Sequence, residues 1–384
     1  MQRVYSLGLD VDKTSFKCCM KLKDGSAKAI TKASCSFSNS LAGFHELLGW
    51  IQKHRKFADA ELKIVMEATG VYHEYLAFFL HDSGFAVYIT LPLRAKRYFQ
   101  SLGYKSKNDK IDAQALADLG LQQDLRLWTP CSKHLLQLRS LTRQLQMLQE
   151  NRTTLNNQLE AAEHLMYCDK VVIKNFKSLI TSIDKDIKQL KERINEFIMN
   201  DEILVSKFRL VEPIKGLGII TFATIVAETG GFELFENQKQ LVSYAGYDVI
   251  ENQSGKRIGK TKISKQGNTH IRRILHLASF NVVRYKVATF NEQYDRIYDR
   301  TRIKMKGYVA VQRKLLCLIY ALWKSHSQFN PQYQSKNLSG NHDPKTLFSV
   351  GPQGPLTKVA TGTPMATLDE LPCNQSPEAL FSVS

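Results

Sequence analysis

Four acidic side chains are the strongest candidates for chemistry in this chain. Asp10 stands in the run GLDVDKT, Glu67 in MEATGVYHE, and Asp109 and Asp112 in NDKIDAQALAD. Four carboxylates held together repel one another unless a cation neutralises them, and hard oxygen ligands select Mg²⁺ or Mn²⁺. Two such ions can stabilise the attacking and leaving oxygens of a phosphodiester displacement. Each acid alone has a structural explanation, because Asp109 is a natural N-cap and Asp112 a first-turn residue; their joint placement favours a metal site.

A second candidate is Ser254, which lies in a strongly basic segment. Nine Lys or Arg residues and no acid occur between Asn252 and Asn291. Such a segment can anchor phosphates through charge neutralisation and through N–H groups at the start of a helix. The cations expected to bind nucleic acid are Lys256, Arg257, Lys260, Lys262, Lys265, Arg272 and Arg273. A serine hydroxyl needs activation to become a nucleophile, and Ser-Gly is by itself a common turn.

The elements that must position the acids alternate between strand and helix. Apolar periodicity predicts strands, a helix and further strand–helix pairs in the order of a ribonuclease H-like α/β layer. In that fold the first and fourth strands are neighbours, so we expect Asp10 and Glu67 side by side. Alternation along the strand places Asp12 on the face of Asp10, as an extra ligand or a turn-forming acid. The predicted strands are 4–9, 16–22, 29–37, 62–66 and 85–89, and the predicted helices 41–56, 72–83, 94–102 and 110–121.

Residues 132–200 carry two long apolar seams. Leucines from Leu138 to Leu159 keep a spacing of three and four, with Arg152 at one seam position, and a second seam runs from Ile173 to Phe197. One helix cannot bury such a seam, so the two segments pair with each other or with another subunit. The sequence leaves both arrangements open.

Residues 204–330 are expected to form a mostly helical module. The turn at 213–218 resembles a helix–hairpin–helix, whose glycines let backbone N–H groups approach a phosphate; the alternative is a helix-ending glycine followed by a core helix. A loop rich in Gly and Lys follows, and then mostly helix from 268 to 328 with an interruption near Gly307. The segment 331–384 is rich in Pro, Ser and Gly without periodicity, which predicts a disordered tail.

Composition restricts the class of protein. Lys and Arg exceed Asp and Glu by 17, and because residues 331–384 hold three lysines and four acids, the excess lies in the first 330 residues. A body this basic needs an anionic partner, nucleic acid above all. No apolar run approaches the ~20 residues of a membrane helix, and acids interrupt the first apolar stretch too early for a secretory signal. The odd, scattered cysteines contain no CxxC pair, which predicts a reduced, cytoplasmic protein.

The motifs resemble those of one family, the DEDD-type insertion-sequence transposases. GLDVDKT, MEATGVY and NDKIDAQALAD resemble its three acidic motifs, and PIKGLGIITFATIVAETGGF, LVSYAGYD, QSGKR and SKQGNTHIRRIL its carboxy-terminal domain. The resemblance implies a RuvC-like domain over 1–130, a coiled-coil hairpin over 131–203, a serine transposase domain over 204–330 and a tail over 331–384. It also implies that the four acids bind metal and that Ser254 forms a covalent phosphoserine link to DNA.

The resemblance further implies partners. Members cut and join donor and target DNA under the guidance of a structured bridge RNA, and they work as homo-oligomers, from dimer to tetramer, held partly by the helical hairpin. Asp12 and the tail depart from the family pattern. Three other interpretations stay open: a site-specific DNA invertase without a guide RNA, a metal-dependent junction-resolving nuclease in which Ser254 is merely structural, and a basic nucleic-acid scaffold without enzymatic activity.

Overall fold

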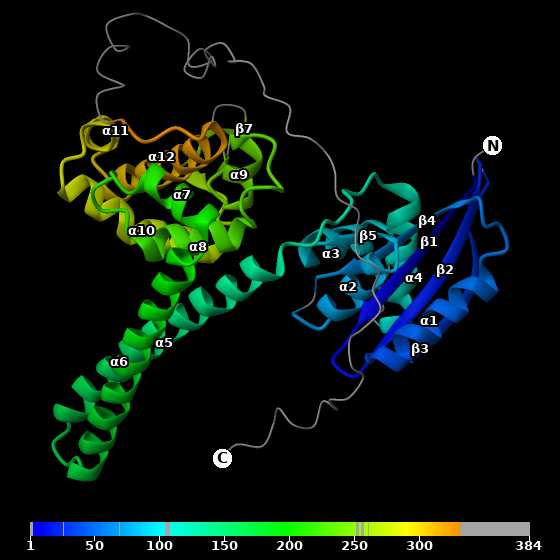
Figure 1. Ribbon diagram of the computed structural model, residues 1–384, viewed down its shortest axis with the longest axis horizontal. Coiled ribbons are helices and arrows are strands. Elements are labelled where there is room, and N and C mark those ends of the chain that lie inside the picture. Colours follow the sequence, from blue (N-terminus) through cyan, green and yellow to red (C-terminus); the bar gives the residue numbers. More distant parts are fainter. Residues whose placement is uncertain are drawn as a thin grey trace, which may run out of the picture. The chain divides into compact units, whose positions relative to one another are not determined.

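A mixed sheet of five strands forms the amino-terminal part of the computed structural model, which describes residues 3–25, 27–68, 70–103, 108–250, 253–254, 257–259 and 261–330. The strand order is β3-β2-β1-β4-β5, with β1 antiparallel to β2 and parallel to β4 (Figure 1). The prediction that the first and fourth strands are neighbours is therefore confirmed. The strands are β1 (Arg3–Val11), β2 (Ser15–Asp24), β3 (Ile30–Ser38), β4 (Glu61–Glu67) and β5 (Ala86–Thr90).

Helices cover both faces of the sheet. Leu7 and Leu9 of β1 belong to one apolar cluster with Leu47 and Leu80, from the first two helices. A second cluster joins Val65 of β4 to the next two helices on the opposite face. Because successive side chains alternate, Ser6, Gly8 and Asp10 face this second pair. The helices are α1 (Leu41–His54), α2 (Glu74–Asp82), α3 (Pro92–Ser101) and α4 (Asp109–Gln122).

Two long helices, α5 (Lys133–Glu163) and α6 (Lys170–Met199), pack side by side within one chain (Figure 1). Leu138 and Ile194 are fully buried in the seam, and Arg152 forms an ion pair with Asp184 of the opposite helix. Pairing within the chain is thus observed. The expected oligomer, from dimer to tetramer, stays a prediction.

Helices α7 to α12 form the carboxy-terminal part around α8, whose residues from Thr221 to Thr229 are all buried. Phe222 and Ile225 of α8 share one apolar cluster with Leu275 and Leu315, and the seam residue Leu138 joins the same cluster. The bounds are α7 (Glu202–Val211), α8 (Ile219–Thr229), α9 (Gln238–Tyr244), α10 (Thr269–Arg284), α11 (Ala288–Thr301) and α12 (Lys304–Ser325).

The interruption expected near Gly307 falls at 302–303, between α11 and α12, and Gly307 itself lies inside α12. A Cβ on Gly307 would come within 2.7 Å of the Tyr294 ring, so the glycine serves close packing of α11 on α12 rather than a break. The actual breaks fall at 285–287 and at 302–303, where Lys286 and Arg302 adopt positive φ. The predicted disordered tail lies outside the described residues. Among those residues, none of the helices has both the length and the apolar content to cross a membrane.

Candidate functional site

Asp10 and Glu67 lie next to each other at the carboxyl ends of two parallel strands. The last paired residues of β1 and β4 in the register are Leu9 and Met66, so the residue that follows each stands beside the other. Directly adjacent residues of parallel strands point to the same face. Both side chains are half-buried, and they face the side of the sheet that α4 covers.

Two glycines bring α4 unusually close to that face. A Cβ on Gly8 of β1 would overlap the Ala113 carbonyl oxygen and come within 2.5 Å of the Ala117 nitrogen. A Cβ on Gly120 of α4 would come within 2.7 Å of a methyl group of Val65. With no side chain at either position, the backbone of the helix rests directly on the strands. Such contacts fix where each turn of α4 lies along β1.

These contacts place the first turn of α4 beside Asp10 and Glu67. Gly120 lies over Ser6, and the stretch 113–117 lies over Gly8, so α4 runs antiparallel to β1. A strand advances about 3.3 Å per residue and a helix about 1.5 Å. Moving two residues along β1, from Gly8 to Asp10, therefore corresponds to moving four or five residues back along α4, to its first turn. Asp109 and Asp112 both belong to that turn.

The expected N-cap role of Asp109 is wrong. Asn108 caps α4, because its φ of −152° is extended and its side chain accepts a hydrogen bond from the Ile111 backbone N–H at 2.9 Å. Asp109 is instead the first helical residue, where a carboxylate is stabilised by the helix dipole. The structural explanation that competed with a metal role for Asp109 is thereby weakened.

Lys17 is a residue of this site that the sequence reasoning missed. It stands opposite Asp10 in the β1–β2 register, and its Nζ lies 2.6 Å from Oδ2 of Asp109. A second lysine, Lys21, makes the same kind of ion pair with Asp118, also at 2.6 Å. The alternation of lysines along SFKCCMK was the available signal, since positions 17, 19 and 21 of a strand share one face.

The described side chains contain no group of three or more His, Cys, Asp or Glu arranged to hold a metal ion. The backbone brings the elements that carry the four acids together, while the ammonium group of Lys17 holds Asp109. The assignment of Asp10, Glu67, Asp109 and Asp112 as metal ligands stays a prediction. Asp12 lies in the β1–β2 turn, where its N–H donates to the Ser15 carbonyl oxygen at 2.9 Å, which favours the turn-forming role.

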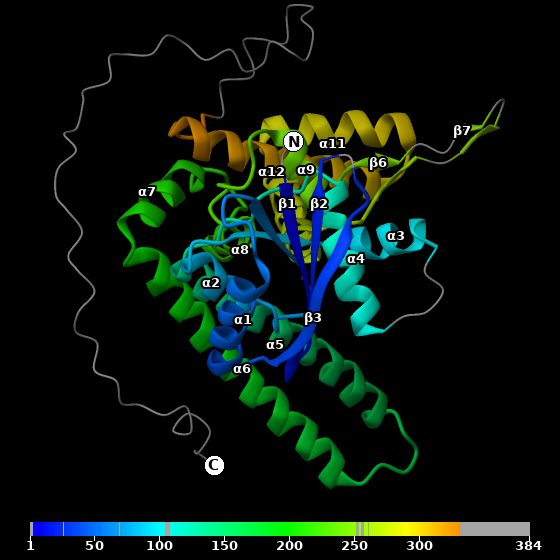
Figure 2. The same ribbon diagram turned by 90° about the vertical axis from the view of Figure 1, so that its right-hand side faces the viewer.

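Ser254 lies on a short antiparallel ribbon where a loop was expected. Strands β6 (Val249–Ile250) and β9 (Lys262–Ile263) pair at its base, and β7 (Gln253–Ser254) and β8 (Arg257–Ile258) pair farther out (Figure 2). Ser254 is opposite Arg257, so two residues separate the paired positions. The base of the ribbon is fixed where the Ser264 N–H donates to the Asp248 carbonyl oxygen at 2.7 Å.

The predicted nucleic-acid-binding cations have different surroundings. Lys262 and Lys265 are exposed, whereas Arg272 donates to the Ala245 carbonyl oxygen at 2.9 Å and Arg273 forms an ion pair with Glu150. Arg257 belongs to β8. Lys256 and Lys260 lie outside the described residues. Among the predicted DNA-binding cations whose side chains are described, Lys262 and Lys265 are therefore the exposed ones.

The Gly-x-Gly turn between α7 and α8 is built for packing at one glycine. Gly216 has a φ of 100°, and a Cβ there would come within 2.9 Å of the Asn281 Cβ and 3.0 Å of the Val282 nitrogen. Gly218 caps α8 without a side-chain hydrogen bond. Helix α8 is buried, which agrees with the alternative prediction that this turn leads into a core helix. Close approach of α10, rather than of a phosphate, explains Gly216.

A buried carboxylate, Glu228, joins four helices and was also missed. Its side chain is 1% exposed and accepts two hydrogen bonds from Arg143 of α5, at 2.7 and 2.9 Å. Asn268 donates to the same carboxylate at 2.7 Å while capping α10, and the Tyr244 hydroxyl donates to the Glu228 carbonyl oxygen at 3.0 Å. Buried charges need such partners, so Glu228 fixes the start of α10 and the end of α9 to helix α5.

The pKa of Glu228 reflects this competition. Burial acts first and would raise it, but the hydrogen bonds from Arg143 and Asn268 and the charge of Arg143 leave the pKa below its ordinary value. His270, whose Nδ1 lies 2.7 Å from the Gln146 Oε1, has a pKa lowered chiefly by burial. His270 is thus a packing residue whose ring is hydrogen-bonded within the protein.

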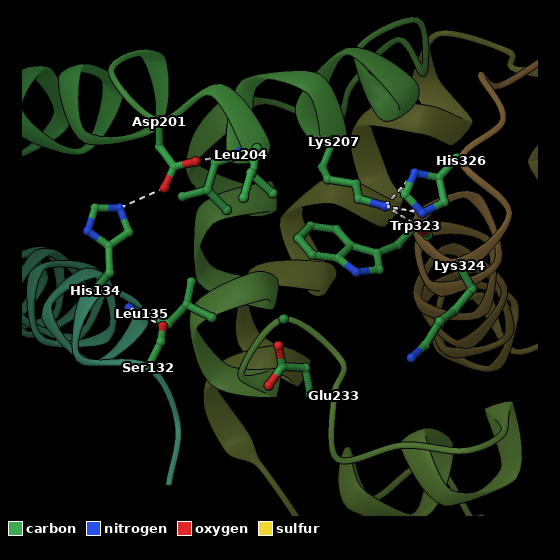
Figure 3. A pocket seen from close by; sticks show the side chains of 12 residues that line it. Ser132, His134, Leu135, Asp201, Leu204, Lys207, Glu233, Trp323, Lys324 and His326 are labelled. Atoms are coloured by element: carbon green, nitrogen blue, oxygen red, sulfur yellow. Dashed lines mark hydrogen bonds and ion pairs between the residues drawn. The ribbon is translucent and has the colours of Figure 1, made fainter. Parts of the chain in front are cut away.

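A cavity of about 520 Å³ opens beside α5, α7 and α12 (Figure 3). Lys207 donates to the Trp323 carbonyl oxygen at 2.7 Å and contacts His326, and the ring of His134 forms an ion pair with Asp201 at 2.9 Å. None of the described residues that line it belongs to the predicted site. Its charged groups are largely engaged with one another, and we assign it no function.

Two family models match the chain. A DEDD transposase model of the IS110 type matches residues 7–166, and a model of the transposase IS116/IS110/IS902 family matches residues 208–295. The first match contains Asp10, Glu67, Asp109 and Asp112, and the second contains Ser254 and the basic segment.

Three comparisons with individual proteins complete these findings. The pilin gene-inverting protein of Moraxella bovis is 29% identical over 333 residues, which cover 86% of this chain and 98% of the relative. The transposase for insertion sequence element IS1111A of Coxiella burnetii is 23% identical, with 55% of this chain and 63% of the relative covered. The solved structure of Thermus thermophilus RuvC matches 32% of this chain and 99% of its own chain, at 13% identity and a TM-score of 0.25.

Proposed function

Because both IS110-type family models match this chain, we propose that it cuts and rejoins donor and target DNA at one site built from the four acids and Ser254. The observation that carries the proposal is the seating of α4 on β1. Through Gly8 and Gly120 it places the turn with Asp109 and Asp112 over the strand ends with Asp10 and Glu67. Acids brought to one edge of the sheet in this way could hold the ions of a metal-dependent phosphoryl transfer.

The residues fit a divalent cation in kind, and their backbone positions lie at one edge of the sheet. Carboxylate oxygens are the donors that Mg²⁺ and Mn²⁺ prefer, and a cation, the Lys17 ammonium, already lies on Asp109. Thr90, the β5 partner of Glu67, has a buried hydroxyl oxygen without a hydrogen-bond partner in the described structure. Asp10, Glu67, Asp109 and Asp112 would hold the ions. When bound, such ions supply charge stabilisation for a pentavalent phosphorus and its leaving oxygen.

Ser254 is proposed as the nucleophile. Its Oγ forms a bond to phosphorus as the bond from phosphorus to a sugar oxygen breaks; the serine proton leaves, and the sugar oxygen is protonated. The reverse reaction, with a sugar hydroxyl from the other DNA as the attacking group, rejoins strands without an external energy source. Support comes from the position of Ser254 on the basic ribbon, opposite Arg257, where cations neutralise phosphate.

Sequence choice is proposed to come from a bridge RNA that pairs with donor and target DNA. The described part of the basic segment offers Lys262 and Lys265 as exposed charges, which suit backbone contacts rather than base reading. We further propose that the working form is a tetramer, in which the acids of one subunit serve the serine of another. The domain limits 1–130, 131–203 and 204–330 belong to the same proposal.

A plasmid recombination assay tests the proposal. The wild type with Mg²⁺ should recombine element ends with a target, whereas Asp112→Asn and Ser254→Ala should each reduce the product by about 10³-fold or more, since each removes a group needed in the transition state. Arg3→Gln, which removes an exposed ion pair with Asp24, is the control. Full activity of either site variant would contradict the assignment of that residue.

A second candidate is a site-specific DNA invertase that uses no guide RNA. It is favoured by the similarity to the pilin gene-inverting proteins, which extends over 86% of this chain. Sequencing the RNA that copurifies with the protein separates the two. One abundant structured RNA supports the guided transposase, and recombination by RNA-free protein supports the invertase.

A further inference from the structure

Lys17 carries a positive charge into the group of acids from a strand that holds none of them. The residue lies on β2, opposite Asp10 on β1, and both side chains share the face that α4 covers. Its Nζ lies 2.6 Å from Oδ2 of Asp109. Lys17 is therefore in contact with one proposed metal ligand and is the cross-strand neighbour of another.

The geometry of α4 shows that this ion pair follows from the way the helix is seated. From Lys17 to Lys21 a strand advances by about 13 Å, and from Asp109 to Asp118 a helix rises by about 13.5 Å. The two lysines of β2 thus match two acids of α4, both at 2.6 Å. The Lys21 pair is nearly buried, with side chains 12% and 13% exposed, whereas Lys17 and Asp109 are 40% and 65% exposed.

Because the Lys21–Asp118 pair is nearly buried and the Lys17–Asp109 pair is exposed, the two ion pairs have different roles. A nearly buried ion pair is held in place by its surroundings, and breaking it leaves an uncompensated charge. An exposed pair is worth little and exchanges readily, because water solvates both partners when they separate. Lys21 and Asp118 therefore fasten α4 to the sheet, while Lys17 can leave Asp109 at small cost.

We propose, on the basis of the function proposed above, that Lys17 is the resident counter-ion of the carboxylate site and that a divalent cation displaces it from Asp109. Without bound metal the ammonium reduces repulsion among the acids. On loading, Asp109 exchanges this ammonium for the cation. Lys17 is thus a positioning residue whose presence weakens metal binding.

Mn²⁺ titration of the full chain, followed by the loss of the free-ion electron paramagnetic resonance signal, tests this. Removing the competitor in Lys17→Met should tighten Mn²⁺ binding by about two- to fivefold, the factor that corresponds to an exposed ion pair. Lys17→Arg keeps the charge and should stay at or below the wild-type affinity. Arg3→Met removes a comparably exposed ion pair, with Asp24, that does not involve α4, and it should leave Mn²⁺ affinity unchanged.

The outcomes separate this inference from the proposed function. Unchanged or weaker Mn²⁺ binding by folded Lys17→Met, with Asp109→Asn and Asp112→Asn abolishing it, overturns the role of Lys17 and leaves the metal site standing. Wild-type protein whose Mn²⁺ binding is unaffected by Asp109→Asn and Asp112→Asn overturns the proposed site itself. The melting temperature of each variant, measured with and without Mn²⁺, identifies those that fail to fold.

Discussion

Replacement of Arg143 by methionine tests the buried network around Glu228 that joins α5, α8, α9 and α10. Glu228 is 1% exposed and Arg143 46% exposed. Removing one partner of a fully buried ion pair costs about 3–5 kcal/mol. Half of the guanidinium already faces water, and Asn268 would still donate to the carboxylate, so we expect Arg143→Met to lower the free energy of unfolding by about 2–3 kcal/mol. Glu228→Gln leaves Arg143 able to turn to solvent, so its cost should be about 1–2 kcal/mol.

Urea unfolding followed by circular dichroism measures both changes. The double variant should be more stable than the sum of the single effects predicts, by about 1–2 kcal/mol, because the second substitution removes the charge that the first left unpaired. Arg152→Met, which removes the exposed ion pair with Asp184, is the matched control and should have a much smaller effect. Additive costs, or an Arg143→Met effect no larger than that of Arg152→Met, would refute this reasoning.

Three further predictions follow from the same structure. Gly8→Ala should cost about 1–3 kcal/mol of stability through overpacking and should weaken Mn²⁺ binding, because its Cβ would overlap the backbone of α4; unchanged binding would show that α4 does not position the acids. The folded-state pKa of Glu228 lies below its ordinary value, so the folded state holds fewer protons there than the unfolded state, and the free energy of unfolding should fall as the pH drops below about 4.5. When this free energy is measured against pH, Glu228→Gln should lose less of it in acid than the wild type, and an equal slope would contradict the lowered pKa of Glu228. Lys262→Gln and Lys265→Gln should each reduce the salt slope of DNA binding by about one, as measured by fluorescence anisotropy, and an unchanged slope would place DNA elsewhere.

The elements of the amino-terminal α/β part were predictable because the sequence patterns that indicate them lie within each element. Apolar alternation and turn residues located the five strands and four helices that carry Asp10, Glu67, Asp109 and Asp112, with errors confined to their ends. The N-cap was misassigned because Asn108 and Asp109 are both good caps, and only the backbone angles decide between them. The break near Gly307 was predicted, but the sequence does not show that Gly307 itself lies inside the helix, because a glycine that breaks a helix and one that admits a neighbouring ring look alike in sequence.

Contacts between residues far apart in the chain could not be predicted from the sequence. Lys17 reaches Asp109 across 92 positions, and Arg143 reaches Glu228 across 85. Neither pair shares a periodic pattern, because each depends on how one element rests on another. The ribbon that carries Ser254 was missed because each of its strands is only two residues long, too short for alternation to show.

Identification of the residue that becomes linked to DNA tests the central claim most directly. Protein incubated with Mg²⁺ and a substrate that cannot be rejoined should be trapped as an adduct, digested and sequenced by mass spectrometry. We predict that DNA is attached to the peptide containing Ser254, and that Asp10→Asn, Glu67→Gln, Asp109→Asn or Asp112→Asn each abolishes the adduct. Strand cleavage without any adduct, an adduct on another residue, or an adduct that forms equally without the four acids would contradict a single site shared by the carboxylates and the serine.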